Sequence, residues 1–140
     1  MENKTVNILV VDDEEDLCWM IKKTLRMAGF TVKSANSGSQ ALVNLAQKNY
    51  RVAFVDAKIP DMDGLRLAAF IRQRSPQTSI ILISGYYYPE DKTIVDGINR
   101  NLFDSFIAKP FDLNEVRRLT RRAVDESEKR PNVQSFNSGS

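Results

Sequence analysis

The chain has 140 residues, with 20 Lys and Arg against 18 Asp and Glu and a formal net charge of +2. This length predicts one domain whose core is large enough to fold without disulfides or a structural metal. The single cysteine, Cys18, excludes an internal disulfide, and the absence of histidine excludes Ser-His-Asp catalysis, Cys-His catalysis and His-ligated metals. The small net charge, the strand-sized apolar runs and the lack of a signal peptide lead us to expect a cytoplasmic protein that binds neither nucleic acid nor membrane.

Short apolar runs alternate with amphipathic stretches in the first half of the chain, which predicts alternating strands and helices. Helical spacing of apolar residues ends at Gly29, and a capping box begins at Ser37. The predicted elements are a strand at 7–11, a helix at about 14–28, a strand at 31–35, a helix from 37 onward, and a strand at 52–55 that ends in Asp56.

The second half of the chain continues the alternation after a turn-like segment at 58–64. The predicted elements here are a helix through 65–71, a strand at 79–83, a helix that starts near Pro89, a strand at 105–108, and a last helix from a capping box at 112–115 through Val124. Five strands, each followed by a helix, predict an α/β fold with a doubly wound parallel sheet covered on both faces. We expect the domain to span 5–126, and 127–140 to be a flexible tail or the start of a linker.

Polar residues collect where the predicted strands end, and ligands of open parallel sheets bind beyond those carboxyl ends. The residues in question are Asp12, Asp13 and Glu14 after the first strand, Asp56 after the third, Ser84 after the fourth and Lys109 after the fifth. Clustered carboxylates repel one another unless a cation joins them, and oxygen ligands without His or Cys favour Mg²⁺. A carboxylate can also act as a nucleophile and form an aspartyl-phosphate, whose oxygens Mg²⁺, Lys109 and Ser84 would stabilise.

The motifs at these strand ends resemble the receiver domain of two-component response regulators. They are Val10-Val11-Asp12-Asp13-Glu14, Asp56 with Pro60 and Asp63-Gly64, Ile83-Ser84-Gly85, and Lys109-Pro110-Phe111. The resemblance runs from about Val6 to Val124 and implies a flavodoxin-like (βα)5 sandwich with strand order 2-1-3-4-5. It also implies a phosphorelay switch that takes a phosphoryl group from a sensor histidine kinase or a histidine phosphotransfer protein, rather than a turnover enzyme.

The resemblance assigns a role to each residue of the acidic crevice. Asp56 is the expected phosphoacceptor, and Asp13 is expected to ligate Mg²⁺ directly. Asp12 would contribute to the metal site through its charge and a bound water, and the backbone carbonyl of Lys58 would be a further ligand.

The resemblance also implies a conformational switch. Ser84 would move towards the phosphoryl group, and Lys109 would pair with the phosphoryl oxygens. Pro110 would follow a cis peptide bond. Phe106 would rotate inward with Ser84 and change the surface formed by the fourth helix, the fifth strand and the fifth helix.

Several of these residues have simpler interpretations. Taken alone, Asp12 and Asp13 would be interpreted as caps of the next helix. The presence of Asp56, Ser84 and Lys109 favours a metal site instead. The remaining acids and packing residues are expected to have no chemistry of their own: Asp61 and Asp63 as turn residues, Glu14 and Glu15 as first-turn helix acids, Asp16 as a surface acid, and Cys18 and Trp19 as packing residues.

Four arginines form a basic stripe on the last predicted helix: Arg117, Arg118, Arg121 and Arg122. The default interpretation is a solvated helix face. The alternative is a docking interface for an acidic partner, including a second copy that places Asp91, Asp96 or Asp104 opposite the stripe, and hence a phosphorylation-dependent homodimer.

The segment Tyr86-Tyr87-Tyr88 lengthens the loop that follows Ser84. It is either a harmless insertion or an aromatic lid or docking patch beside the phosphorylation site. Tyr86 and Lys58 occupy positions from which side chains of the family influence hydrolysis, so we expect a long-lived phosphoryl group.

Three other functions compete with the phosphorelay switch. A Mg²⁺-dependent phosphohydrolase of the dehalogenase type usually has a second acid two residues after its nucleophile, where this chain has Lys58. A nucleotide-binding protein would need a Gly-rich loop after the first strand, which is missing. A receiver that binds partners without phosphorylation is disfavoured because the acidic pair, Asp56, Ser84 and Lys109 are all present. The resemblance fits two settings, a stand-alone regulator and the receiver part of a longer response regulator.

Overall fold

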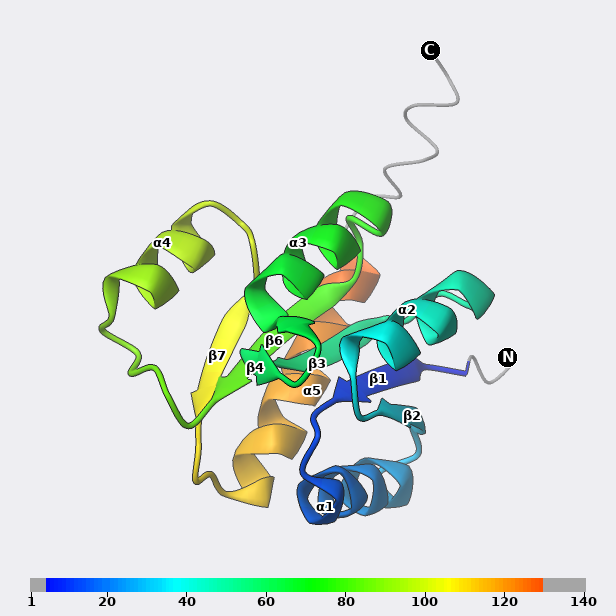
Figure 1. The fold of residues 1–140 in the computed structure, drawn as a ribbon. Helices are drawn as coiled ribbons and strands as arrows, with labels where there is room; N and C mark the ends of the chain where they lie inside the picture. Colours follow the sequence, from blue (N-terminus) through cyan, green and yellow to red (C-terminus); the bar gives the residue numbers. More distant parts are fainter. Residues whose placement is uncertain (1–4, 130–140) are drawn as a thin grey trace.

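A computed structural model of the chain describes residues 5–129, with side chains from 5 to 126. Strands and helices alternate through this region (Figure 1). They are β1 (Asn7–Val11), α1 (Glu15–Met27), β2 (Thr31–Ala35), α2 (Gly38–Gln47), β3 (Val52–Asp56), β4 (Lys58–Ile59), β5 (Met62–Asp63), α3 (Gly64–Arg74), β6 (Ser79–Ser84), α4 (Lys92–Asn99), β7 (Ser105–Ala108) and α5 (Leu113–Lys129).

The main sheet has five parallel strands in the order β2-β1-β3-β6-β7. Counted without the short β4 and β5, this is the order 2-1-3-4-5, so the predicted fold class and strand order are confirmed. Where the sequence predicted a turn, β4 and β5 form a small antiparallel hairpin between β3 and α3. Because all five strands are parallel, their carboxyl ends lie together on one side of the molecule.

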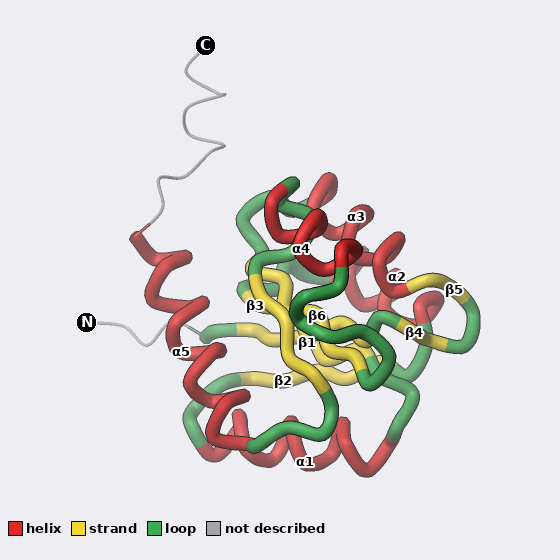
Figure 2. The backbone as a smooth tube through the Cα atoms, turned by 90° about the vertical axis from the view of Figure 1, so that its left-hand side faces the viewer, coloured by secondary structure: helices red, strands yellow, loops and turns green. Residues whose placement is uncertain are grey.

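Alternating side chains of the sheet divide between two hydrophobic cores, one on each face. Leu9, Val55 and Leu82 point to the core shared with α2, α3 and α4. Phe54 and Ile81 point to the core shared with α1 and α5. Figure 2 shows the corresponding layers, with α2, α3 and α4 on one side of the sheet and α1 on the other. The strands are buried along nearly their whole length, which explains their continuous apolar runs.

Asp61 and Asp63 lie on the β4–β5 hairpin and cap the N-termini of α2 and α3. The carboxylate of Asp61 accepts hydrogen bonds from the backbone N–H groups of Gly38 and Ser39, at 2.8 and 2.9 Å. Asp63 Oδ1 accepts the N–H of Leu65 at 2.9 Å. These bonds satisfy free N–H groups at the start of α2 and α3. Both acids lie in the segment predicted as a turn, but they bond helix N-termini, and neither belongs to the cluster of Asp12, Asp13 and Asp56.

Two predicted helix boundaries differ from the observed ones. The fourth helix begins at Lys92 with Asp91 at its N-cap, three residues after Pro89. The last helix continues to Lys129, past Val124, because its polar final turn has no apolar residue for periodicity to detect. The predicted domain boundary after residue 126 falls within this helix, and the rest of the predicted tail (127–140), from 130 onward, lies outside the described residues.

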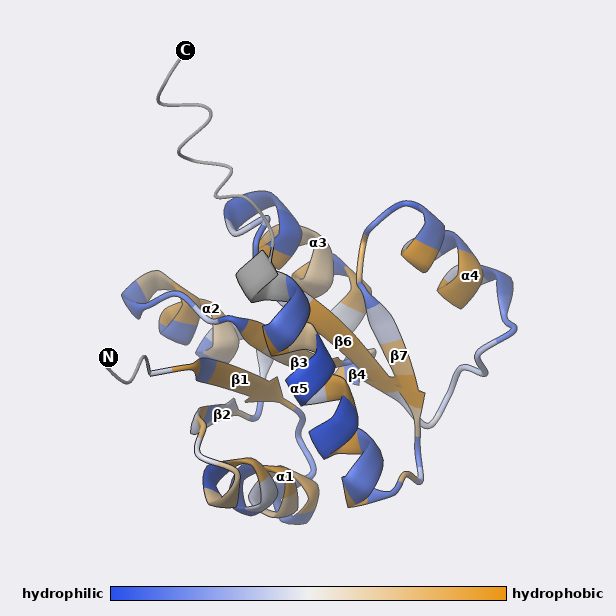
Figure 3. Cartoon of the chain, turned by 180° about the vertical axis from the view of Figure 1, so that it is seen from behind, coloured by the Kyte–Doolittle hydropathy of each residue, from blue (hydrophilic) through white to orange (hydrophobic). Residues whose placement is uncertain are grey.

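The outer helices carry polar residues towards solvent, and Figure 3 shows this division most clearly on α5. One prediction about α1 is wrong: Trp19 does not pack in the core but is 61% exposed. Cys18, its neighbour, is buried as expected. Within the described part of the chain, no helix is both long enough and apolar enough to span a membrane.

Candidate functional site

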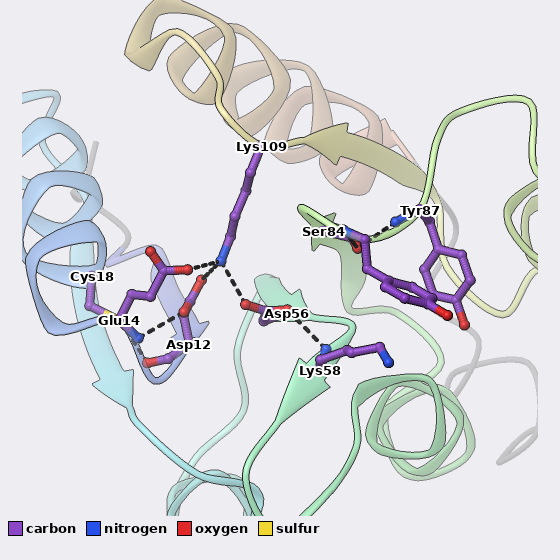
Figure 4. Close-up of polar contacts among 9 residues, drawn as sticks. Asp12, Glu14, Cys18, Asp56, Lys58, Ser84, Tyr87 and Lys109 are labelled. Atoms are coloured by element: carbon purple, nitrogen blue, oxygen red, sulfur yellow. Dashed lines mark hydrogen bonds and ion pairs between the residues drawn. The ribbon is translucent and has the colours of Figure 1, made fainter.

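The predicted crevice forms at the carboxyl edge of the main sheet. Asp12 follows β1, Asp56 is the last residue of β3, and Lys109 follows β7. The strands are in a register that places Val11 beside Val55 and Asp56 beside Ile83, so these ends are level. Figure 4 shows Lys109 reaching across the edge of the sheet to the carboxylates.

The ammonium group of Lys109 joins three carboxylates. Its Nζ lies 2.9 Å from Asp12 Oδ2, 2.6 Å from Glu14 Oε2 and 2.7 Å from Asp56 Oδ2. The Lys109 side chain is only 15% exposed. Burial alone would lower the pKa of Lys109, but the hydrogen bonds to Asp56, Glu14 and Asp12 outweigh burial and raise it. Lys109 therefore stays cationic and offsets part of the repulsion among the acids.

Asp12 is the most deeply buried acid of the crevice, with no exposed surface. Loss of hydration on burial raises its pKa from 3.8 to about 6, and the nearby charge of Asp56 adds to the rise. A hydrogen bond from the N–H of Glu14 and the contact with Lys109 act in the opposite direction. The ionised form of Asp12 is therefore held in the crevice at an energetic cost.

Asp12, Asp13 and Asp56 could together hold a metal ion. Each offers a carboxylate oxygen, and these oxygens lie within 4.8 Å of one another. Asp13 is exposed whereas the other two are buried, so an ion would bind between the crevice and solvent. Three carboxylates and no nitrogen or sulfur donor fit a hard divalent cation.

The backbone around Asp56 is tightly constrained. Asp56 Oδ1 accepts the N–H of Lys58 at 2.9 Å, which leaves Oδ2 facing Lys109. A Cβ atom on Gly64 would lie 1.9 Å from the carbonyl oxygen of Asp56, so only glycine fits where α3 begins beside the site. The Asp63-Gly64 pair is therefore a close approach of backbone to the site as well as a turn.

Ser84 is buried at the end of β6, and its hydroxyl is engaged by the loop that follows. Its Oγ accepts the N–H groups of Tyr86 at 2.8 Å and Tyr87 at 3.0 Å. Lys109 is adjacent, because its N–H donates to the Ser84 carbonyl at 2.8 Å. Ser84 thus lies at the predicted position, with its hydroxyl bonded to the loop that contains Tyr86, Tyr87 and Tyr88, which we call the tyrosine loop.

The tyrosine loop reaches back to the hairpin next to Asp56. Lys58 Nζ lies 3.8 Å from the centre of the Tyr86 ring, a cation–π contact between the β6–α4 loop and β4. Tyr87 packs edge-on against Tyr86 with the ring centres 4.9 Å apart, and it is half-buried against the core. Tyr86 and Lys58, which were linked only through the family resemblance, are therefore in direct contact. The role of the Lys58 carbonyl as a ligand stays a prediction.

The remaining predicted residues lie outside the carboxylate cluster. The peptide bond between Lys109 and Pro110 is cis, as predicted, and Phe106 is half-buried on β7. The four arginines of α5 are exposed, and each has a neighbour within the chain. Arg117 bonds Asn114, Arg118 lies 3.9 Å from Glu115, Arg121 lies 6.0 Å from the Phe30 ring centre, and Arg122 lies 3.4 Å from Glu126.

Sequence reasoning missed the contact of Glu14 with Lys109 because it placed Glu14 in the first helical turn. The helix begins at Glu15, so Glu14 is the N-cap residue and has extended backbone angles. Its side chain can therefore turn back to the crevice, where it meets Lys109. The signal was available: Glu14 follows two acids at a strand end, opposite a lysine at another strand end.

Comparisons with known proteins agree with this geometry. A family model described as response regulator receiver domain matches residues 8–121. The chain is 33% identical to the regulatory protein AtoC of Escherichia coli over 84% of this chain and 25% of that protein. It is 32% identical to the DNA-binding transcriptional regulator NtrC of Salmonella typhimurium over 84% of this chain and 24% of that protein. The chain thus spans about a quarter of the length of these relatives.

Solved structures show the same fold. A CheY-like receiver domain protein from Methanospirillum hungatei superposes with a TM-score of 0.83 at 25% identity, covering 90% of this chain and 98% of that one. The response regulator TrrA from Thermotoga maritima, crystallised with Mg²⁺ and BeF, superposes with a TM-score of 0.73 at 26% identity, covering 85% of this chain and 99% of that one.

The buried charge of Asp12 predicts how stability depends on pH. Its pKa is higher in the folded chain than in the unfolded one, so its favourable contribution is present below pH 3.8 and is lost as the pH rises through about 6. We expect Asp12→Asn to raise the free energy of unfolding at neutral pH by about 1–3 kcal/mol. Urea denaturation in a metal chelator measures this, and the gain should shrink as the pH falls towards 4. Asp16→Asn, at an exposed site on α1, is the control; an equal gain from both variants would contradict the explanation.

Proposed function

This chain belongs to the response regulator receiver domain family, and on that basis we propose that Asp56 is the residue that accepts the phosphoryl group. The observation that carries the proposal is the position of Asp56 Oδ2, which lies 2.7 Å from Lys109 Nζ and within the acidic cluster of Asp12 and Asp13. A receiver domain is a signalling module rather than a turnover enzyme. Membership of this family implies a partner kinase. We propose a sensor histidine kinase or a histidine phosphotransfer protein as the donor.

In the proposed transfer, a carboxylate oxygen of Asp56 attacks the phosphorus of the partner's phosphohistidine. A P–O bond to Asp56 forms as the P–N bond of the donor breaks, and the electron pair of that bond stays on the departing imidazole nitrogen. Lys109 is already beside Asp56, where its charge would stabilise the phosphoryl oxygens. The N–H of Lys58 holds Asp56 Oδ1, so Oδ2 is the oxygen that faces Lys109.

We propose Mg²⁺ as the cation of this site, held by Asp12, Asp13 and Asp56 and by the backbone carbonyl of Lys58. The all-oxygen donor set supports this choice, and Asp13 is exposed, so an ion can enter from solvent. When bound, Mg²⁺ supplies positive charge to the phosphoryl oxygens.

The proposed output is a change of surface on α4, β7 and α5. If the Ser84 hydroxyl turns to the phosphoryl group, the N–H groups of Tyr86 and Tyr87 lose their acceptor, and the loop before α4 must rearrange. Phe106, half-buried on β7, would move inward at the same time. The phosphoryl group would thus favour one of two packings of the same chain.

The downstream effector is not specified by this site. NtrC of Salmonella typhimurium, whose name gives a DNA-binding function, is about four times longer than the region matched, so that function is not transferred to this domain. A cytoplasmic location, expected from the sequence, also stays a proposal. A phosphorylation-dependent homodimer through the α5 arginines has less support than the sequence suggested. The acids expected opposite them already have partners within the chain: Asp104 with Arg72, Asp96 with Lys92, and Asp91 with the backbone N–H of Tyr88.

Incubation with a small phosphodonor such as acetyl phosphate tests the phosphoacceptor directly. Intact-protein mass should show one added phosphoryl group in the wild type when Mg²⁺ is present and none without it. Asp56→Asn should abolish the adduct, whereas Asp16→Asn on the exposed face of α1 should retain it. An adduct that survives in folded Asp56→Asn, or a folded wild type that never forms one, would refute the assignment. Size exclusion of the phosphorylated form tests the homodimer.

The contact of Tyr86 with Lys58 predicts slow loss of the phosphoryl group. A bulky ring and a cation beside Asp56 would crowd the attacking water, and a cation–π contact of about 1 kcal/mol would hold both in place. We expect Tyr86→Ala to hydrolyse its phosphoryl group roughly fivefold faster than the wild type. Tyr88→Ala, which removes an exposed ring of the same loop, is the matched control. Equal lifetimes in wild type and Tyr86→Ala would show that the pair does not protect the site.

A further inference from the structure

The first turn of helix α2 cannot satisfy its own backbone N–H groups. Ser37, the N-cap residue, accepts the N–H of Gln40 at 3.1 Å. The N–H groups of Gly38 and Ser39 need acceptors outside the helix, because no carbonyl precedes them by one helical turn. The first turn also carries no acidic residue, so its partial positive charge has no counter-charge on α2 itself.

Asp61 provides both the missing acceptors and the missing charge. It lies in the turn of the β4–β5 hairpin, where its Oδ1 accepts the N–H of Gly38 at 2.8 Å and its Oδ2 accepts the N–H of Ser39 at 2.9 Å. The same two hydrogen bonds hold the pKa of Asp61 below its usual value, so the carboxylate stays ionised at neutral pH. Although Asp61 is exposed, both of its oxygens are therefore bonded to α2.

The hairpin also packs closely against α2 at this point. A Cβ atom on Gly38 would lie 2.5 Å from Cγ of Met62, so glycine is what allows the hairpin to approach the helix. Across the hairpin, Met62 is paired with Ile59, and Asp63 is paired with Lys58. Figure 2 shows the hairpin beside α2. A contact at Asp61 and Met62 therefore bears on the position of the whole hairpin.

The other end of the hairpin reaches the carboxylate of Asp56. Lys58, the first residue of β4, donates its N–H to Asp56 Oδ1 at 2.9 Å. The second oxygen, Oδ2, then lies 2.7 Å from Lys109 Nζ. The hairpin thus connects the start of α2 with the group that orients Asp56, through contacts that are all within the chain.

We propose that Asp61 is a positioning residue for the transfer of the phosphoryl group to Asp56. Asp61 holds the hairpin against α2, and the hairpin keeps the N–H of Lys58 on Asp56 Oδ1. The attacking carboxylate must keep one orientation, and small displacements of a reacting group slow a reaction. The proposal rests on the proposed function of Asp56, but the hold of Asp61 on the Lys58 N–H exists without phosphorylation and can be measured without it.

A purely structural role for Asp61 as a cap of α2 is the alternative, and Ser37 separates the two. Ser37 caps the same helix through the N–H of Gln40 but belongs to α2's own N-terminus and not to the hairpin. Both Asp61→Ala and Ser37→Ala remove a cap, so both should lower the melting temperature. Only Asp61→Ala should loosen the hairpin. Asp63 still bonds the N–H of Leu65 on α3, so the hairpin is loosened rather than released.

Amide hydrogen exchange at Lys58, followed by NMR, measures the first step. The full-length, unphosphorylated protein is used in a metal chelator. We expect Asp61→Ala to speed exchange of the Lys58 N–H roughly fivefold, because its bond to Asp56 opens more often, and Ser37→Ala to stay within about twofold of the wild type. Asp61→Asn, which keeps one acceptor oxygen, should lie between Asp61→Ala and the wild type. Thermal melting confirms that each variant is folded.

The rate of adduct formation measures the second step. Phosphorylation by acetyl phosphate is followed by intact-protein mass at saturating Mg²⁺. We expect Asp61→Ala to form the adduct roughly fivefold more slowly than the wild type and Ser37→Ala to form it within about twofold of the wild-type rate.

Three results would overturn the positioning role while leaving the function of Asp56 intact. They are unchanged exchange at Lys58 in Asp61→Ala, an unchanged rate of adduct formation in that variant, and equal effects of Asp61→Ala and Ser37→Ala, which would mean that only the stability of α2 matters. A folded wild type that forms no adduct would overturn the role of Asp56 and the positioning role with it, whatever the exchange at Lys58 shows.

Discussion

The ammonium group of Lys109 is the contact on which the acidic edge of the sheet depends. Parallel strands in this order bring Asp12 and Asp56 to neighbouring positions, and Glu14 turns back to join them. Without a cation, carboxylates this close would repel one another and draw in protons. Lys109 follows β7, the last strand in the sheet order, and its ammonium group lies within 2.9 Å of all three carboxylates. One side chain thus connects the first, third and last strands of the sheet.

This arrangement favours chemistry at the expense of stability. Asp12 is fully buried with a raised pKa, so the folded chain holds a charge that it would more readily neutralise. Asp56 is fixed by the N–H of Lys58, and Gly64 approaches its backbone so closely that no side chain fits. In the proposed transfer, the oxygens of a phosphoryl group on Asp56 would replace the carboxylates around Lys109. The hydroxyl of Ser84 accepts hydrogen bonds from the backbone of the tyrosine loop. A movement of that hydroxyl would therefore disturb the loop.

Most of the fold and of the site could be predicted from the sequence because both follow simple periodicities. Buried strands appear as apolar runs, and alternation alone places Asp12, Asp56, Ser84 and Lys109 at one edge. What could not be predicted depends on single helix boundaries and on side-chain direction. Glu14 was assigned to a helix that begins one residue later. Trp19 was expected to pack, but it is 61% exposed and lies outside the buried face of α1 formed by Cys18, Ile21, Thr24 and Leu25.

Magnesium affinity measures most directly whether Lys109 is the cation that holds the acidic edge together. If it is, Lys109 competes with Mg²⁺ for Asp12 and Asp56, and its removal must favour the metal. Isothermal titration of the unphosphorylated protein with MgCl₂, at fixed ionic strength, compares the wild type with Lys109→Met and with Lys48→Met as a control. The account predicts roughly tenfold tighter binding to Lys109→Met and no change for the control. Equal or weaker binding to a folded Lys109→Met would contradict it.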